Sequence, residues 1–154
     1  MPVQRATVSI MALVIGWLAG TSGLAADFPA EDPKPFAEAR VLLQLSDRDE
    51  AKQSIVLDVA NNLIKHYGGP DMIDIEIVAF GPGIDLLFAG NARAERIDSL
   101  AVSGVRFVAC MNTVDTVERI TGKRPELSSH AIGVQTGVAH IVSRGAEGYT
   151  LVRP

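Results

Sequence analysis

The sequence predicts an α/β fold, a three-layer α/β/α sandwich around a mainly parallel five-stranded sheet. Three observations support this prediction. Apolar segments of strand length alternate along the chain with amphipathic segments of helix length, which is typical of parallel βαβ units with right-handed crossovers. Several strand-like segments are apolar on both faces, as strands covered by helices on both sides are. Glycine-containing turns separate many of these segments.

The five expected strands are runs of apolar residues. The first run, "ARVLLQLS", has strand length and is suited to burial on both faces. The second, "IDIEIVAF", alternates and then becomes fully apolar, as a strand does when it enters a core. In chain order, the expected strands cover residues 39–46, 73–80, 105–109, 131–137 and 149–153.

The clearest helix follows the first strand. Apolar residues, Ile55 among them, recur at every fourth position, whereas polar residues such as Gln53 fall on the other side. Asp47 or Asp49 is expected to cap its start, and the sequence Gly-Gly-Pro at residues 68–70 ends it.

The later helices are shorter. Asn112 or Thr113 is expected to cap the helix that follows the third strand, and Gly122 stops it. The last helix is expected to turn its apolar residues inward, namely Val138, Ile141 and Val142. The expected shorter helices cover residues 84–90, 92–103, 113–120 and 138–146.

The first 25 residues have the layout of a signal peptide. One basic residue, Arg5, precedes an apolar run, and small residues follow that run. The apolar run over residues 8–18 is short for a membrane span, which takes about 20 residues, although an uncleaved anchor is the alternative. Cleavage is expected after Ala25 or Ala26, which predicts an exported, periplasmic protein.

The mature chain is expected to form one domain. Residues 26–37 are rich in proline and acidic residues and predict a flexible leader, and residues 38–154 predict a single domain. The whole chain has a formal charge of −4 and no cluster of lysines and arginines. We therefore expect no nucleic-acid partner, and no membrane docking after the signal peptide is removed.

Cys110 is the only cysteine of the chain. An exported protein uses cysteines mainly in pairs, so a single one is buried and inert, paired between chains, or a free reactive thiol. Cys110 lies between a predicted strand and a predicted helix, and a helix N-terminus lowers the pKa of a thiol. Arg106, four residues earlier, is a weak candidate as a charge partner. The alternative is that Cys110 is a small buried apolar residue.

Two segments are expected at the same edge of the sheet, where open parallel sheets bind ligands. The turn "GPG" follows the second strand and "CMNT" begins at the end of the third. Beside Cys110 as the candidate reactive residue, the candidate binding residues are Gly81, Pro82, Gly83, Asn112 and Thr113.

No metal or cofactor is expected from the sequence. The three histidines, His66, His130 and His140, are scattered without metal-ligand spacing, and none is expected to lie beside a convincing carboxylate partner. Asp85 and Asp98 lie in separate helical segments without an evident acid–base role.

Several phrases of the mature chain resemble the DsrE/DsrF-like family, and within it the small stand-alone members of the YchN type. The most specific are "VAFGPGI", "ACMNT" and the terminal "GY…RP", and the likeness extends from about Arg40 to Pro154. The resemblance implies a three-layer sandwich that assembles as trimers or hexamers. In the sulfur-relay members a cysteine carries a persulfide, and Cys110 is the residue that matches it.

Two hypotheses follow. In the first, the protein handles sulfur: the Cys110 thiolate attacks a sulfur donor, holds the sulfur as a persulfide and passes it to an acceptor thiol. Amides of the glycine-rich turn and of the region around Asn112 would then stabilise the anionic sulfur. In the second, the protein is a non-enzymatic oligomer that binds a small ligand or serves assembly, and Cys110 is a buried structural residue.

Overall fold

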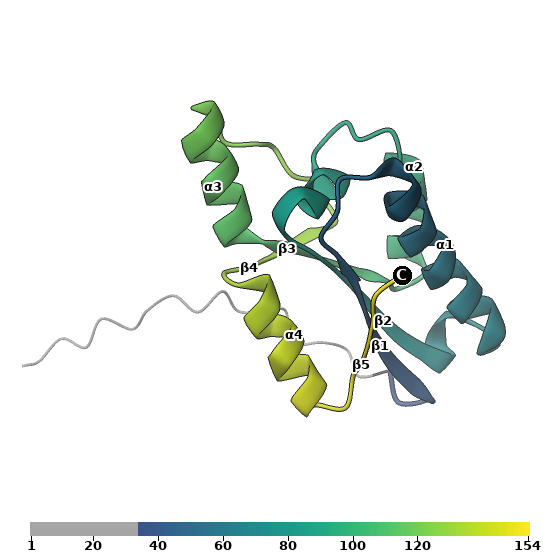
Figure 1. Ribbon diagram of the computed structural model, residues 1–154. Coiled ribbons are helices and arrows are strands. Elements are labelled where there is room, and N and C mark those ends of the chain that lie inside the picture. The colour runs from purple at the N-terminus through teal and green to yellow at the C-terminus, as the bar shows by residue number, and fades with distance from the viewer. Residues whose placement is uncertain (1–33) are drawn as a thin grey trace, which may run out of the picture.

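The computed structural model describes residues 34–154. The expected signal peptide and residues 26–33 of the expected leader lie outside the described residues. Within the described part, the predicted α/β fold is confirmed: five strands form one parallel sheet with the order β4-β3-β2-β1-β5 (Figure 1). The strands are β1 Ala39–Leu45, β2 Ile73–Ala79, β3 Arg106–Cys110, β4 Ala131–Val134 and β5 Thr150–Val152. The helices are α1 Glu50–His66, α2 Ala94–Val102, α3 Met111–Thr121 and α4 Gly137–Ala146, with short 3-10 helices η1 Pro70–Met72 and η2 Gly81–Leu87.

The crossovers distribute the helices over the two faces of the sheet. Parallel neighbours need a connection that passes over one face, and helices fill these connections. Helices α1 and α2 lie on one side of the sheet, whereas α4 lies on the other and α3 projects beyond the β3–β4 edge (Figure 1). Alternate residues of each strand face the two sides, so Phe107 joins the core under α1 and α2 while Val108 joins the core under α4.

The two cores differ in size and polarity. The larger one fills the space between the sheet, α1, α2 and η2 with apolar side chains from every one of these elements. The smaller one lies under α4 and consists of Leu42, Val78, Val108, Val134, Ile141 and Tyr149, with Phe80 packed against it. Strand β2 is buried along its whole length, including Asp74 and Glu76, which face the smaller core.

Helix α1 differs in part from the pattern predicted for it. Asp49 caps it by accepting a hydrogen bond from the backbone of Lys52 at 2.9 Å. Ile55 is exposed, however, and Gln53 is buried. The Gln53 amide is satisfied there because it donates to the Arg48 carbonyl at 3.3 Å and accepts from the Arg93 guanidinium at 3.2 Å.

Two predictions about the later helices are wrong. Neither Asn112 nor Thr113 caps α3, because the helix begins at Met111 and Cys110 itself occupies the cap position. In α4, Val138 and Val142 are 51% and 69% exposed, and only Ile141 of the three expected residues is buried. Two polar residues, His140 and Arg144, occupy positions of α4 that face the sheet, where apolar side chains were expected.

The last residues of the expected leader are tied to the domain. The Lys34 ammonium group donates to the carbonyls of Pro70, Ile73 and Gly104 at 3.0, 3.1 and 3.2 Å. Burial lowers the pKa of Lys34, partly offset by Asp74. Over residues 34–154, none of the helices has both the length and the apolar character needed to cross a membrane.

Candidate functional site

Cys110 lies where two helices begin. It is the last residue of β3 and directly precedes α3, and its side chain faces the side of the sheet on which α4 lies. The first residue of α4, Gly137, is so close that a Cβ on it would lie 3.1 Å from the Cβ of Cys110. Helices α3 and α4 therefore both start beside Cys110, at the end of β3 (Figure 1), and helix N-termini stabilise anions.

The surroundings of the sulfur favour its ionised form. Cys110 is only 6% exposed, and burial raises the pKa of the thiol. Hydrogen bonding from the Gly137 amide and from the hydroxyl and amide of Thr113 outweighs burial and lowers the pKa below its ordinary value. The protonated thiol has only a long contact of 3.9 Å with the Gln135 carbonyl.

Thr113 connects the two segments that were predicted to meet. Its hydroxyl oxygen accepts a hydrogen bond from the Gly81 amide at 3.0 Å, which leaves the hydroxyl hydrogen to point at the Cys110 sulfur. The chain of donors thus runs from the glycine-rich turn through Thr113 to the thiol. The structure brings Gly81, Thr113 and Cys110 together.

Asn112 fixes the loop between β4 and α4. Its amide donates to the Gln135 carbonyl at 3.1 Å and its side chain donates to the Thr136 hydroxyl at 3.0 Å. The Gln135 side chain in turn donates to the Asn112 side-chain oxygen at 2.5 Å. Because Thr136 directly precedes α4, Asn112 holds the start of α4 next to the start of α3.

Pro82 and Gly83 belong to the first turn of η2, away from the sulfur donors. Pro82 is exposed at the start of this helix. Gly83 is buried, and a Cβ on it would lie 2.5 Å from the Leu45 carbonyl oxygen of β1. The close approach of η2 to the backbone of β1 explains the glycine at this position.

Gly137 is a residue of the site that was not predicted from the sequence. The only signal was a glycine at the junction of the fourth strand and the last helix, which by itself indicates a turn. Its role depends on its place beside Cys110, Phe80 and Val78: a Cβ on it would lie 3.1 Å from the Cβ of Cys110, which is a tight contact, and 3.5 and 3.6 Å from Phe80 and Val78. These neighbours belong to β2, β3 and the start of η2, far from Gly137 in sequence.

A second missed feature is a cluster of buried charged and polar side chains on the same face of the sheet as Cys110. We call it the Glu76 cluster, and its members are Asp74, Glu76, Arg106, His140, Arg144 and Tyr149. The Glu76 carboxylate, fully buried on β2, accepts from Arg106 at 2.9 Å, from Arg144 at 2.7 Å and contacts His140 Nε2 at 2.6 Å. The expectation that no histidine has a carboxylate partner is therefore wrong for His140. It is also wrong for His130, whose Nε2 lies 3.0 Å from Asp98 Oδ1.

The far end of the Glu76 cluster is organised by Tyr149. Its hydroxyl donates to the Asp74 carboxylate at 2.5 Å and accepts from Arg106 at 2.8 Å. Burial and the bond to Asp74 raise the pKa of Tyr149 to about 12. Burial raises the pKa of Asp74, but the hydrogen bonds from Arg106 and Tyr149 outweigh it and lower that pKa below its usual range.

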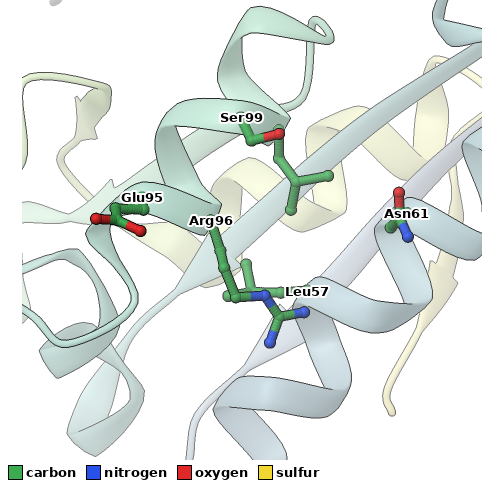
Figure 2. Close-up of a pocket in the computed structure, with 6 residues that line it drawn as sticks. Leu57, Asn61, Glu95, Arg96 and Ser99 are labelled. Atoms are coloured by element: carbon green, nitrogen blue, oxygen red, sulfur yellow. The ribbon is translucent and has the colours of Figure 1, made fainter.

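One surface hollow lies away from the cysteine. It has a volume of about 370 Å³ and lies between α1 and α2 (Figure 2). Leu57 and Asn61 line it from α1, and Glu95, Arg96 and Ser99 line it from α2. Arg96 is engaged by Asp58 at 2.5 Å. The hollow belongs to the opposite face of the sheet from Cys110 and contains no nucleophilic thiol, histidine or cysteine.

Among residues 34–154, no group of three or more histidine, cysteine, aspartate and glutamate side chains is arranged to hold a metal ion.

Comparison with known proteins finds a similar solved structure. No family model matches the chain, and no curated protein matches it. The solved structure of MTH1491, a protein of unknown function from Methanobacterium thermoautotrophicum, is similar to it with a TM-score of 0.67. The two sequences are 30% identical over 76% of this chain and 100% of the archaeal chain. This similarity supports the α/β sandwich, and the chain belongs to the same protein family as MTH1491.

Proposed function

We propose that this protein is an exported, DsrE-like sulfur-handling protein in which Cys110 carries a sulfur atom as a persulfide. One observation carries the proposal: donors from two helix N-termini and from Thr113 converge on the Cys110 sulfur and lower its pKa although the residue is buried. A structural cysteine does not need such donors, whereas a thiolate nucleophile does. The resemblance of "ACMNT" to the DsrE/DsrF-like family, in whose sulfur-relay members a cysteine carries a persulfide, supports the same role.

The proposed chemistry is a sulfur transfer between thiols. The Cys110 thiolate attacks the terminal sulfur of a small persulfide, R–S–SH. A new S–S bond forms between Cys110 and that sulfur as the S–S bond of the donor breaks, and R–S⁻ departs, so that Cys110 becomes Cys–S–SH. The transferred sulfur keeps its oxidation state, and no outside oxidant or reductant is needed. An acceptor thiolate takes the sulfur by the same exchange, which restores the Cys110 thiolate.

A second candidate function is favoured by the burial of the thiol. Cys110 is 6% exposed, and a buried free cysteine is commonly a structural residue. In this second account, the protein is a non-enzymatic oligomer that binds a small ligand or serves assembly. The donors around Cys110 then stabilise the junction between α3 and α4.

Assembly into trimers or hexamers is also part of the proposal. Val138 and Val142 form an exposed apolar stripe on α4, and Leu151 is exposed on the edge strand β5. A monomer gains nothing from such exposure, whereas a second copy of the chain could cover it. Export to the periplasm is supported by the signal-peptide layout of residues 1–25.

The first test is sulfur loading, read by intact mass. The native chain is incubated with a small persulfide, and we expect it to gain the mass of one sulfur atom, whereas Cys110→Ser gains none. Thr113→Val removes the hydroxyl that faces the sulfur and should load several times more slowly. Thr116→Val is the matched control, because its hydroxyl bonds the Asn112 carbonyl of the same helix at 2.9 Å and should leave loading unchanged.

The second candidate predicts a different pattern. The native chain would then gain no sulfur, although the denatured chain would react. That result would replace the sulfur-carrying role with a structural role for Cys110.

A further inference from the structure

The face of α4 that lies on the sheet is unusually polar. Gly137 and Ile141 are its buried residues, and the side chains of His140 and Arg144 are only 10% and 12% exposed. These four positions have the spacing of one helix face. Two of them are small or apolar and two are polar, so apolar contacts alone do not fix where α4 lies along the sheet.

Both polar residues of this face meet one carboxylate. His140 Nε2 lies 2.6 Å from Glu76 Oε2, and Arg144 Nη2 lies 2.7 Å from Glu76 Oε1. Glu76 is fully buried on β2 and also accepts from Arg106 of β3 at 2.9 Å. Moving α4 by one turn, about 5.4 Å, would separate both α4 side chains from a buried charge, which is strongly unfavourable.

The geometry connects this contact with the thiol. Arg106 pairs in register with Glu76, and Cys110 lies four residues further along β3, about 13 Å away. Gly137 precedes Arg144 by seven residues of α4, about 10 Å along the helix axis. When the carboxylate holds one end of α4, the other end reaches the sulfur.

We propose that Glu76 is a positioning residue for Cys110: by holding His140 and Arg144, it places α4 so that the Gly137 amide meets the sulfur. The functional meaning of this positioning rests on the proposed sulfur chemistry. Glu76 itself does not touch the sulfur, because Val78 and Val108 lie between the Glu76 cluster and Cys110 on the same face of the sheet.

The direction in which the pKa of the Cys110 thiol shifts when Glu76 is neutralised distinguishes a positioning role from a direct effect of the Glu76 charge. Among the described residues, the charged and titratable groups on this face or against it include Lys34, Asp74, Glu76, Arg106, His140, Arg144, Glu147 and Tyr149. If Glu76 acted on the sulfur through its charge, neutralising it would remove a like charge and lower the pKa of the thiol. If Glu76 acts by placing α4, neutralising it withdraws the Gly137 amide and raises that pKa.

The test compares Glu76→Gln with the unchanged chain. The rate of Cys110 alkylation is followed over a pH series on the native protein, and intact mass identifies the product. We expect the alkylation rate of Glu76→Gln at neutral pH to fall about three- to tenfold, with the midpoint of the profile moved to higher pH. Val56→Ala is the control, because it removes buried volume from the other core on α1 and should leave the midpoint in place.

Three results would overturn the proposal: an unchanged midpoint in Glu76→Gln, a midpoint moved to lower pH, or an equal upward shift in Val56→Ala. If Glu76→Gln does not fold, the same alkylation series is measured on Arg144→Lys and judged by the same criteria. This variant keeps the positive charge but loses the planar guanidinium group that reaches Glu76. Sulfur loading of the unchanged chain is a separate readout. If the unchanged chain takes up no sulfur but Glu76→Gln still moves the alkylation midpoint to higher pH, only the proposed function is refuted.

Discussion

A buried thiol normally ionises reluctantly, because the thiolate loses its hydration when it leaves water. Cys110 is buried, yet the Gly137 amide and the hydroxyl and amide of Thr113 favour its anionic form. None of these donors carries a full charge. The acidity of the thiol therefore depends on short-range geometry, which makes the placement of Gly137 and Thr113 the controlling feature of the site.

Tyr149 allows a test at the residue scale of the Glu76 cluster. Its pKa is raised from 10.0 to about 12, so between these pH values the unfolded chain loses the tyrosine proton while the folded chain keeps it. The folded state then binds more protons, and stability falls as pH rises. We expect the contribution of Tyr149 to the free energy of unfolding to fall by up to about 3 kcal/mol between pH 10 and pH 12.

The measurement is the free energy of unfolding of the unchanged chain and of Tyr149→Phe, taken from pH 8 to pH 12. At pH 8 the variant should be less stable by about 1–3 kcal/mol, because the Asp74 carboxylate loses a donor. The difference should narrow steadily above pH 10. A difference that stays constant up to pH 12 would contradict the assigned state of Tyr149.

At the scale of the element, α4 is the helix that joins the site to the Glu76 cluster. Its start lies against Cys110, and its polar inward residues pair with Glu76 of β2. Helix α3 supplies Thr113 from the other side of the sulfur, and Asn112 ties the two helix starts together. The site is thus assembled from three elements that a single change in α4 can disturb.

Two glycines of α4 provide a matched pair. A Cβ at Gly137 would lie 3.1 Å from Cys110 and 3.5 Å from Phe80, whereas a Cβ at Gly145 would have no neighbour within 4 Å. We expect Gly137→Ala to lower the free energy of unfolding by about 1–3 kcal/mol and to raise the pKa of the thiol. Gly145→Ala should be neutral or stabilise by up to about 1 kcal/mol.

The readouts are chemical denaturation for stability and the pH profile of alkylation for the thiol. An alanine at residue 137 that leaves the thiol profile unchanged would mean that the amide of Gly137 does not govern the sulfur.

At the scale of the whole molecule, the sheet has a well-protected centre and weaker edges. Strand β2 lies in the middle of the order β4-β3-β2-β1-β5 and is buried throughout, whereas the three residues of β5 are exposed. Amide protection follows burial and pairing on both sides. The 30% identity with MTH1491 spans that whole archaeal chain, so the same organisation is expected there.

Hydrogen exchange tests this organisation. In dilute solution, amides of β2 should exchange at least about 100-fold more slowly than those of β5. If copies of the chain cover the β5 edge as proposed, protection of β5 should increase with protein concentration while that of β2 stays the same. Equal protection of the two strands in dilute solution would contradict the described sheet.

The strands and α1 could be predicted because their patterns are local. A run such as "IDIEIVAF" predicts a strand whatever its neighbours are, and the spacing around Ile55 predicts a helix even though Ile55 itself is exposed. Local pattern also placed the glycine-rich turn and Cys110 at the same edge of the sheet. The hydrogen bond from the Gly81 amide to the Thr113 hydroxyl agrees with that placement.

The Glu76 cluster could not be predicted, because burial of a carboxylate depends on partners that are distant in sequence. Arg106 and Arg144 follow Glu76 by 30 and 68 residues and reach it only after the sheet and α4 have formed. For the same reason Val138 and Val142 were expected to face inward: apolar periodicity gives no hint that His140 and Arg144 take the inward positions.

The most direct test of the central claim is the pH dependence of Cys110 alkylation in the native, unchanged chain. We expect full reaction without denaturant and a midpoint below about 8.5, the usual pKa of a free cysteine, because the Gly137 and Thr113 donors stabilise the thiolate. A thiol that reacts only after unfolding, or with a midpoint above that value, would show that Cys110 is a structural core residue and would contradict the account of the site.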